Sequence, residues 1–327
     1  MPRALLLIMD MVSGHAADRE VSPVTGLCYP NADGYMKAGL LPTFQQSRER
    51  GVFVRAWNRQ TCNTPHGMRY LASGSYRAKA SPRLDLDPYW GFDEIAPIPT
   101  ILSACKKACP EGKVAAFGSD AWMQTGWWKA RDCTMGWGSY YSDYLTMQHA
   151  FSWMLANPDW KMLLLYLAQY DMTGNCPLKK EGAAYTEDKH HSLLMLDRYL
   201  WCVCHFLQEK TWWDETFLMI GSDHGCHVGC DVAVKEGRTR GIPEPELKNY
   251  CSNHEPPYDC VAWDFQRNRP TDIRADDCRR TLFMIGGGAL PKVRHGQEIP
   301  EAEIIDFAPT TASLLGIPME TDGKPLL

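Results

Sequence analysis

Short apolar runs alternate with longer amphipathic segments along this chain of 327 residues, and that alternation limits the fold more than any other feature. The apolar runs have the length and composition of buried strands, and they are residues 4–9, 52–56, 113–117, 161–168, 216–221 and 280–285. Segments with helical periodicity lie between or after them, at residues 36–50, 65–74, 99–109, 144–155, 187–207 and 307–315. This order predicts an α/β fold, with a large and mostly parallel mixed sheet sandwiched between helix layers.

The composition supplies enough apolar side chains for one large domain. Hydrophobic residues make up 45% of the chain and charged residues 22%, the balance of an ordinary globular protein. We therefore expect a single domain over residues 1–327. Two segments fit the alternation badly: residues 121–144 are crowded with tryptophan and tyrosine, and residues 234–274 are rich in proline, asparagine and aspartate. We predict that both are insertions at the functional edge of the sheet.

Charge and cysteine content narrow the classes of function and location. The net charge of −5 comes with no long basic run, so the chain lacks the signature of nucleic-acid binding. The first apolar run is too short to cross a membrane, and no transmembrane segment is predicted. The cysteine count, 13, is odd and favours a reducing compartment. A cytoplasmic location is therefore expected, with secretion after removal of a signal peptide as the alternative. Nothing in the sequence indicates an oligomeric state.

Acidic residues follow three of the predicted strands. Asp10 comes directly after residues 4–9, Asp171 lies just past residues 161–168, and Asp223-His224 follow residues 216–221. Parallel strands bring their carboxyl ends to one edge of a sheet, where ligands bind. Each residue alone has an ordinary alternative as a helix cap or a turn. Carboxylates that converge repel one another unless a cation binds among them, and aspartate with histidine suits zinc or manganese. Together the strand ends predict a metal site.

Thr64 is the candidate nucleophile. It precedes Pro65, which is a favoured first residue of a helix, so Thr64 lies at a helix N-terminus. Unpaired amides and the helix dipole favour an anion there. A metal-bound threonine hydroxyl loses its proton more readily and can attack phosphorus. Two alternatives stay open: Thr64 as a simple helix cap, and Cys62 as either the nucleophile or a buried inert thiol.

These motifs resemble those of the alkaline phosphatase superfamily. Ser222-Asp223-His224-Gly225 is similar to its metal-ligand signature, and the segment from Thr64 to Gly74 is similar to its nucleophile segment. Residues 303–310 with 314–318, and the final residues 322–326, resemble its C-terminal segment. The resemblance therefore touches both ends and the middle of the chain, and it implies one alkaline phosphatase-like catalytic domain.

The resemblance also implies a ligand set. One metal site would consist of Asp10, Thr64, Asp223 and His224. A second would hold Asp171 and a late histidine, for which His295 is the candidate. Nucleotide pyrophosphatase/phosphodiesterase relatives carry a histidine where this chain has Asn175, which weakens the second site. His227 is a possible replacement ligand, and His66 a possible metal or substrate contact.

The implied activity is hydrolysis of a small-molecule phosphate ester through a covalent phospho-threonine, with a diester favoured. The implied cofactor is a divalent metal ion, zinc or manganese, with one tight site and a possible second. Three alternatives are a sulfatase-like enzyme that uses Cys62, a phosphomonoesterase, and a degenerate member that binds a phosphoryl ligand without turnover.

Overall fold

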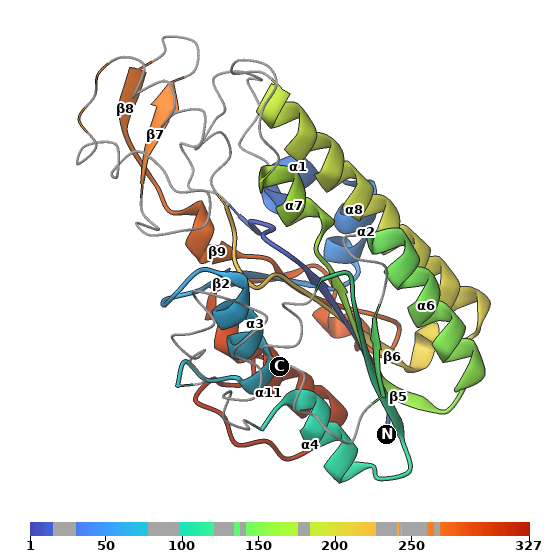
Figure 1. Ribbon diagram of the computed structural model, residues 1–327. Helices are drawn as coiled ribbons and strands as arrows, with labels where there is room; N and C mark the ends of the chain where they lie inside the picture. Colours follow the sequence, from blue (N-terminus) through green and yellow to red (C-terminus); the bar gives the residue numbers. More distant parts are fainter. Residues whose placement is uncertain are drawn as a thin grey trace.

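The computed structural model of the protein describes residues 1–15, 31–77, 99–120, 134–137, 142–175, 184–226, 241, 243, 260–264 and 269–327. Strands and helices alternate along them (Figure 1). The strands are β1 (Arg3–Met9), β2 (Val52–Trp57), β3 (Lys113–Gly118), β4 (Thr134–Trp137), β5 (Trp160–Leu167), β6 (Thr216–Gly221), β7 (Cys260–Asp264), β8 (Arg269–Ala275), β9 (Arg280–Thr281), β10 (Phe283–Gly286) and β11 (Gln297–Glu303). The α-helices are α1 (Ala32–Lys37), α2 (Pro42–Glu49), α3 (Thr64–Ser73), α4 (Ile101–Ala108), α6 (Asp143–Ala156), α7 (Gln169–Asn175), α8 (Ala184–Glu209) and α11 (Phe307–Leu315).

One large sheet organises the described residues. Its strands lie in the order β11-β2-β10-β6-β1-β5-β3-β4, with β9 paired to β2. The central strand β1 is parallel to both neighbours, so Leu6 lies opposite Leu164 of β5 and Met219 of β6. Strand β10 is antiparallel to β6 and to β2. The predicted fold, a mostly parallel mixed sheet, is therefore confirmed.

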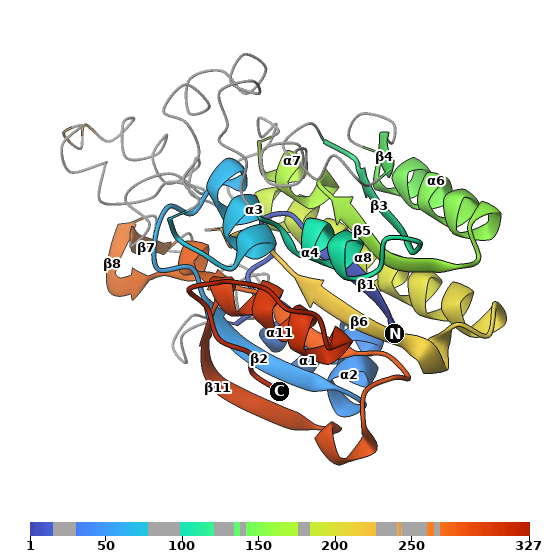
Figure 2. The same cartoon turned by 90° about the horizontal axis from the view of Figure 1, so that it is seen from below.

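Helices cover both faces of this sheet. Helices α1, α2, α6, α7 and α8 lie on one face, and α3, α4 and α11 on the other (Figures 1 and 2). Side chains of β1 point alternately to the two layers: Leu5 and Leu7 join one hydrophobic core, and Leu6 and Ile8 join the other. All of β1 is buried, as expected for a strand covered on both faces, and this explains the unbroken apolar run from Ala4 to Met9.

The predicted helix at residues 36–50 is two helices in the structure. Gly39, at a φ of 73°, ends the turn after α1, and Pro42 begins α2. Leu41 makes no side-chain cap for α2. The carboxylate of Asp197 on α8 replaces that cap, because it accepts from the backbone N–H groups of Thr43 and Phe44, each at 2.9 Å. Asp197 thus ties two helices of one layer together.

Other boundaries differ from the sequence predictions. Residues 134–137, expected inside an insertion, form the edge strand β4, parallel to β3. The rest of 121–141 lies outside the described residues. In the second expected insertion, β7 and β8 pair as an antiparallel ribbon. The run at 280–285 divides into β9 and β10, and β11 was not predicted. No helix in the described part of the chain is long and apolar enough to cross a membrane.

Candidate metal centre

Two strand ends deliver three buried side chains to one place. Strand β1 is followed by Asp10, and the adjacent parallel strand β6 is followed, after Ser222, by Asp223 and His224. Each of these three residues is at most 1% exposed. One ligand atom from each lies within 4.8 Å of the others. The structure therefore brings together three of the predicted ligands.

Backbone amides fix the Asp223 carboxylate. Its Oδ1 accepts from the N–H of Met11 at 3.1 Å and from the N–H of His224 at 3.0 Å. Met11 has a positive φ of 64°, unusual for a residue with a side chain, and this conformation belongs to the loop that carries Asp10. The other oxygen, Oδ2, is buried without a hydrogen-bond partner among the described residues. The carboxylate is thus held by one oxygen and offers the second.

His224 presents a lone pair to the two carboxylates. Its Nδ1 lies 2.9 Å from the backbone oxygen of Gly225. A carbonyl oxygen only accepts, so Nδ1 carries the proton and Nε2 carries the lone pair. Nε2 lies 3.4 Å from Asp10 Oδ1 and 3.5 Å from Asp223 Oδ2. A carbonyl that fixes the tautomer in this way is the usual arrangement of a metal-binding histidine.

The electrostatics of the cluster favour a bound cation. Burial, followed by repulsion from Asp223 and Asp171, raises the pKa of the Asp10 carboxyl well above its ordinary value. Burial also raises the pKa of Asp223 and lowers the pKa of His224. Asp10 Oδ1, like Asp223 Oδ2, is buried without a hydrogen-bond partner among the described residues. Two carboxylate oxygens and a neutral imidazole nitrogen therefore fit one divalent ion, and the donor set suits zinc or manganese.

Thr64 joins this cluster from helix α3, which lies in the same layer as α4 and α11. Its Oγ1 lies 3.2 Å from Nε2 of His224. Helix α3 begins at Thr64, and the preceding Asn63 is its cap, since the Asn63 side chain accepts from the N–H of His66. The alternative that Thr64 serves only as a cap is therefore wrong. Gly67 lets the helix approach, because a Cβ there would lie 2.2 Å from the backbone oxygen of Asp223.

Cys62 and His66 are placed differently. The Cys62 side chain is fully buried, and its Sγ lies 3.4 Å from the backbone oxygen of Gln60, to which it donates. Nδ1 of His66 lies 2.7 Å from the side-chain oxygen of Asn63. Neither belongs to the compact group of ligand atoms found in the described part of the chain. The thiol thus has the surroundings of an inert core cysteine, and His66 supports the helix cap.

The predicted second metal site is only partly described. Asp171 lies in the first turn of α7 and is 9% exposed. The raised pKa of Asp10 has burial as its first cause, the charge of Asp223 as its second and the charge of Asp171 as its third, so Asp171 lies at the same edge. It is outside the compact cluster of ligand atoms. Asn175 ends α7 and its side chain is not described, while His227 lies outside the described residues.

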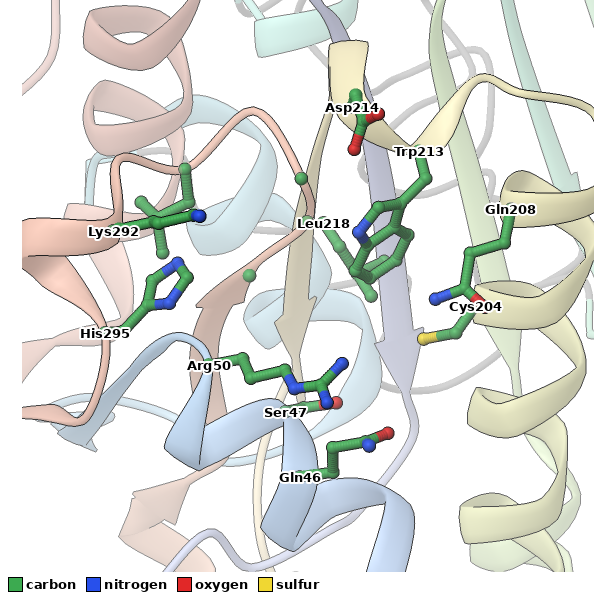
Figure 3. Close-up of a pocket in the computed structure, with 14 residues that line it drawn as sticks. Gln46, Ser47, Arg50, Cys204, Gln208, Trp213, Asp214, Leu218, Lys292 and His295 are labelled. Carbon is green, nitrogen blue, oxygen red and sulfur yellow. The ribbon is translucent and has the colours of Figure 1, made fainter.

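His295 is wrong as a ligand of that second site. It follows a 3-10 helix (Lys292–Arg294), and the next residue, Gly296, donates to the backbone oxygen of Gly51 at the start of β2. That is the amino-terminal edge of the parallel strands. Asp223 lies at the opposite edge, and the six residues of β6 between the two edges span roughly 20 Å. His295 lines a pocket of about 380 Å³ there, with Arg50 and Lys292 (Figure 3).

Three residues at the carboxyl-terminal edge of the sheet, where Asp10 lies, were missed by the sequence analysis. The Tyr166 hydroxyl on β5 donates to Asp10 Oδ2. Asp120 follows β3, is 4% exposed, and its charge contributes to the raised pKa of Asp10. Asp143 accepts from Ser119 Oγ at 2.7 Å and from the N–H of Ala168 at 2.9 Å, which joins the ends of β3 and β5. Asp120 follows a predicted strand as Asp10 does, so the same argument could have identified it. Tyr166 and Asp143 give no such signal in the sequence.

Comparison with solved structures finds the same fold in other proteins. Murine ectonucleotide pyrophosphatase/phosphodiesterase 5 has a TM-score of 0.61 and 14% sequence identity, over 98% of this chain and 97% of that chain. An inactive form of the murine protein, with one threonine replaced by alanine and AMP bound, has the same TM-score and identity over 99% and 98%. The lipoteichoic acid synthase LtaP from Listeria monocytogenes has a TM-score of 0.58 and 14% identity, over 99% of this chain and 74% of that chain.

Sequence comparison gives no such matches, since neither a family pattern nor a curated protein sequence matches the chain. The structural likeness extends over nearly the whole chain, and it agrees with the resemblance of the motifs around Thr64 and Asp223. The chain therefore has the alkaline phosphatase-like fold.

Proposed function

We propose that the protein is a metal-dependent hydrolase of a small phosphate ester, with a diester favoured, and that Thr64 is its nucleophile. The observation that carries this proposal is the distance of 3.2 Å between Thr64 Oγ1 and Nε2 of His224. It puts a hydroxyl beside the Asp10–Asp223–His224 cluster and at the N-terminus of a helix of 10 residues. A nucleophile, a ligand set and an anion-binding helix end thus meet at one point.

The residues have separate tasks in this reaction. Asp10, Asp223 and His224 would hold a zinc or manganese ion, and such an ion would favour the ionised hydroxyl and withdraw charge from the phosphoryl oxygens. Thr64 Oγ1 loses its proton and forms a bond to phosphorus as the bond from phosphorus to the ester oxygen breaks, and the departing oxygen takes up one proton, so that an alcohol leaves and the proton count is unchanged. Water then cleaves the phospho-threonine and restores the hydroxyl. Pro65 has no N–H and the N–H of His66 already donates to Asn63, so the contribution of α3 is the positive end of its helix dipole, which would favour the charge on the phosphoryl oxygens in both steps.

The neighbours support an ester of phosphorus as the substrate class. The murine neighbour is named a nucleotide pyrophosphatase/phosphodiesterase, and its threonine-to-alanine form is called inactive and binds AMP. LtaP is named a lipoteichoic acid synthase. The sulfatase-like alternative needs Cys62 as the reacting group, and that thiol donates to a backbone carbonyl instead. Threonine chemistry is the better supported reading.

One panel of assays tests the proposal. The purified protein is offered a p-nitrophenyl phosphodiester, the monoester and the sulfate in parallel, and its metal content is measured. We expect the diester to be hydrolysed fastest and zinc or manganese to be present. Fastest hydrolysis of the sulfate with only calcium present would establish the sulfatase-like alternative. Binding of a phosphate ester without hydrolysis would establish a degenerate member.

A further inference from the structure

A buried lysine lies directly behind the carboxylate edge. Lys189 of α8 is 1% exposed. Its ammonium donates to the backbone oxygen of Tyr170, lies 3.9 Å from the centre of the Tyr170 ring, and lies 3.5 Å from Met11 Sδ. An ammonium is rarely taken out of water this completely, because the loss of hydration is costly unless negative charge lies near. The position of Lys189 therefore requires an electrostatic explanation.

The neighbours of Lys189 connect it to the candidate metal centre. Met11 follows Asp10, and its N–H donates to Asp223 Oδ1 at 3.1 Å. Tyr170 precedes Asp171 on α7, which packs beside α8 (Figure 1). The pKa of His224 is lowered by burial first; the charge of Asp171 then raises it and the charge of Lys189 lowers it. The contact of Lys189 with Met11, and of Met11 with Asp223, thus places the ammonium beside the centre.

At this edge the negative charges of the buried carboxylates outnumber the positive charges of a single divalent ion. Besides Asp143, whose Oδ1 accepts from Ser119 and Ala168, four carboxylates reach this edge and each is at most 9% exposed: Asp10, Asp120, Asp171 and Asp223. In the part of the chain that the structure describes, only one set of side chains forms a compact ligand group, Asp10 with Asp223 and His224. His295, expected to help hold a second ion, lies at the opposite edge. One divalent ion would balance half of the four carboxylate charges.

We propose that Lys189 is a fixed positive charge that acts in place of a second metal ion, so that the centre works with a single divalent ion. The inference rests on the proposed metal-dependent function. Lys189 is then a positioning residue and makes no contact with the reacting atoms. Its charge stays in place whatever the supply of metal, and it reduces the negative potential that an incoming phosphate ester meets. The same charge repels a divalent ion and must lower the affinity for it.

Because of this repulsion, removing the charge of Lys189 should increase the affinity for a metal ion, whereas loss of a packing role would decrease it or leave it unchanged. Lys189→Met keeps an unbranched side chain, one heavy atom shorter, and removes its charge. We expect the folded variant to bind Mn²⁺ at least tenfold more tightly than the unmodified protein, or to take up a second equivalent, in a calorimetric titration of metal-free protein. Lys189→Arg restores the charge and should return the affinity toward that of the unmodified protein. Lys210→Met removes one charge from an exposed lysine just after α8 and should leave the affinity unchanged.

Two results would overturn the inference. The first is a folded Lys189→Met protein that binds Mn²⁺ equally or more weakly, which is what lost packing predicts. The second uses the unmodified protein and applies even where the variant fails to fold: two Mn²⁺ ions bound per chain with equal, high affinity. One ion per chain supports the inference. The titrations need no substrate, so a protein that shows the expected metal response yet hydrolyses no ester refutes the proposed function and leaves the role of Lys189 intact.

Discussion

Replacement of Thr64 by alanine separates the chemistry of the centre from its folding. Thr64 is 5% exposed, and its hydroxyl contacts His224 Nε2 at 3.2 Å. The substitution removes one hydrogen bond, worth about 1 kcal/mol net, and one buried methyl group, worth roughly another 1 kcal/mol. Asn63 still caps α3 and Gly67 still allows its close approach. We therefore expect unfolding to become easier by only about 1–2 kcal/mol, with the fold kept.

The effect on catalysis should be far larger. Without Oγ1 no covalent phospho-threonine forms, and only attack by water remains. Loss of a nucleophile that acts in both steps should lower kcat/KM at least about 10³-fold, which corresponds to about 4 kcal/mol in the barrier. Thr64→Ser keeps the hydroxyl and should keep most of the activity. The assay is hydrolysis of the p-nitrophenyl diester, with thermal unfolding of each variant measured beside it.

Cys62→Ala is the matched control, because Cys62 is buried in the same segment and lies next to the cap of α3. Its loss should cost some stability and leave kcat/KM within a few-fold of the unmodified value. The reasoning fails if Thr64→Ala keeps its activity while Cys62→Ala loses it. That pair of results would make the thiol the nucleophile and would move the chain to the sulfatase-like alternative.

Three further predictions concern stability and metal binding. In the metal-free protein the lowered pKa values of His15 and His224 oppose the raised pKa values of Asp10 and Asp223 below about pH 6.5. Above that pH the folded state binds more protons than the unfolded state, so stability should fall as the pH rises from about 6.5 to 8. Added zinc should reverse this, and the gap in Tm between loaded and metal-free protein should widen with pH; a constant gap would refute the linkage. Asp197→Ala removes the carboxylate that caps α2 and should lower the free energy of unfolding by about 2–3 kcal/mol while kcat/KM is unchanged. Asn175→His adds an imidazole one turn from Asp171 on α7 and should increase the affinity for a second metal ion, which a titration showing no change would contradict.

The parts of the fold that sequence reasoning predicted are those fixed by local pattern. Strand β1 reads as a strand because every residue is buried between two helix layers, and the acidic residue after it marks the sheet edge. Helix α3 was predicted from Pro65 and Gly74, and Gly74 is its left-handed C-cap. The Asp10–Asp223–His224 group follows from two parallel strands that end together. Tyr166 could not be found in this way, because a tyrosine in a buried strand looks like core until its partner across the sheet is known.

The failure at His295 comes from strand direction, which apolar runs do not encode. A short buried strand has the same composition whether it runs parallel or antiparallel to its neighbour. Strand β10 runs antiparallel to β6, so the residues after it return to the amino-terminal edge, where Gly287 packs so closely on Thr216 that a Cβ would lie 2.0 Å from its backbone oxygen. His295 comes after that reversal and before β11, which runs parallel to β2 and carries the chain back across the sheet. A further metal ligand beside Asp171 must therefore come from one of the segments that follow the parallel strands at the carboxyl edge, or its part must be taken by a charge already there, as we propose for Lys189.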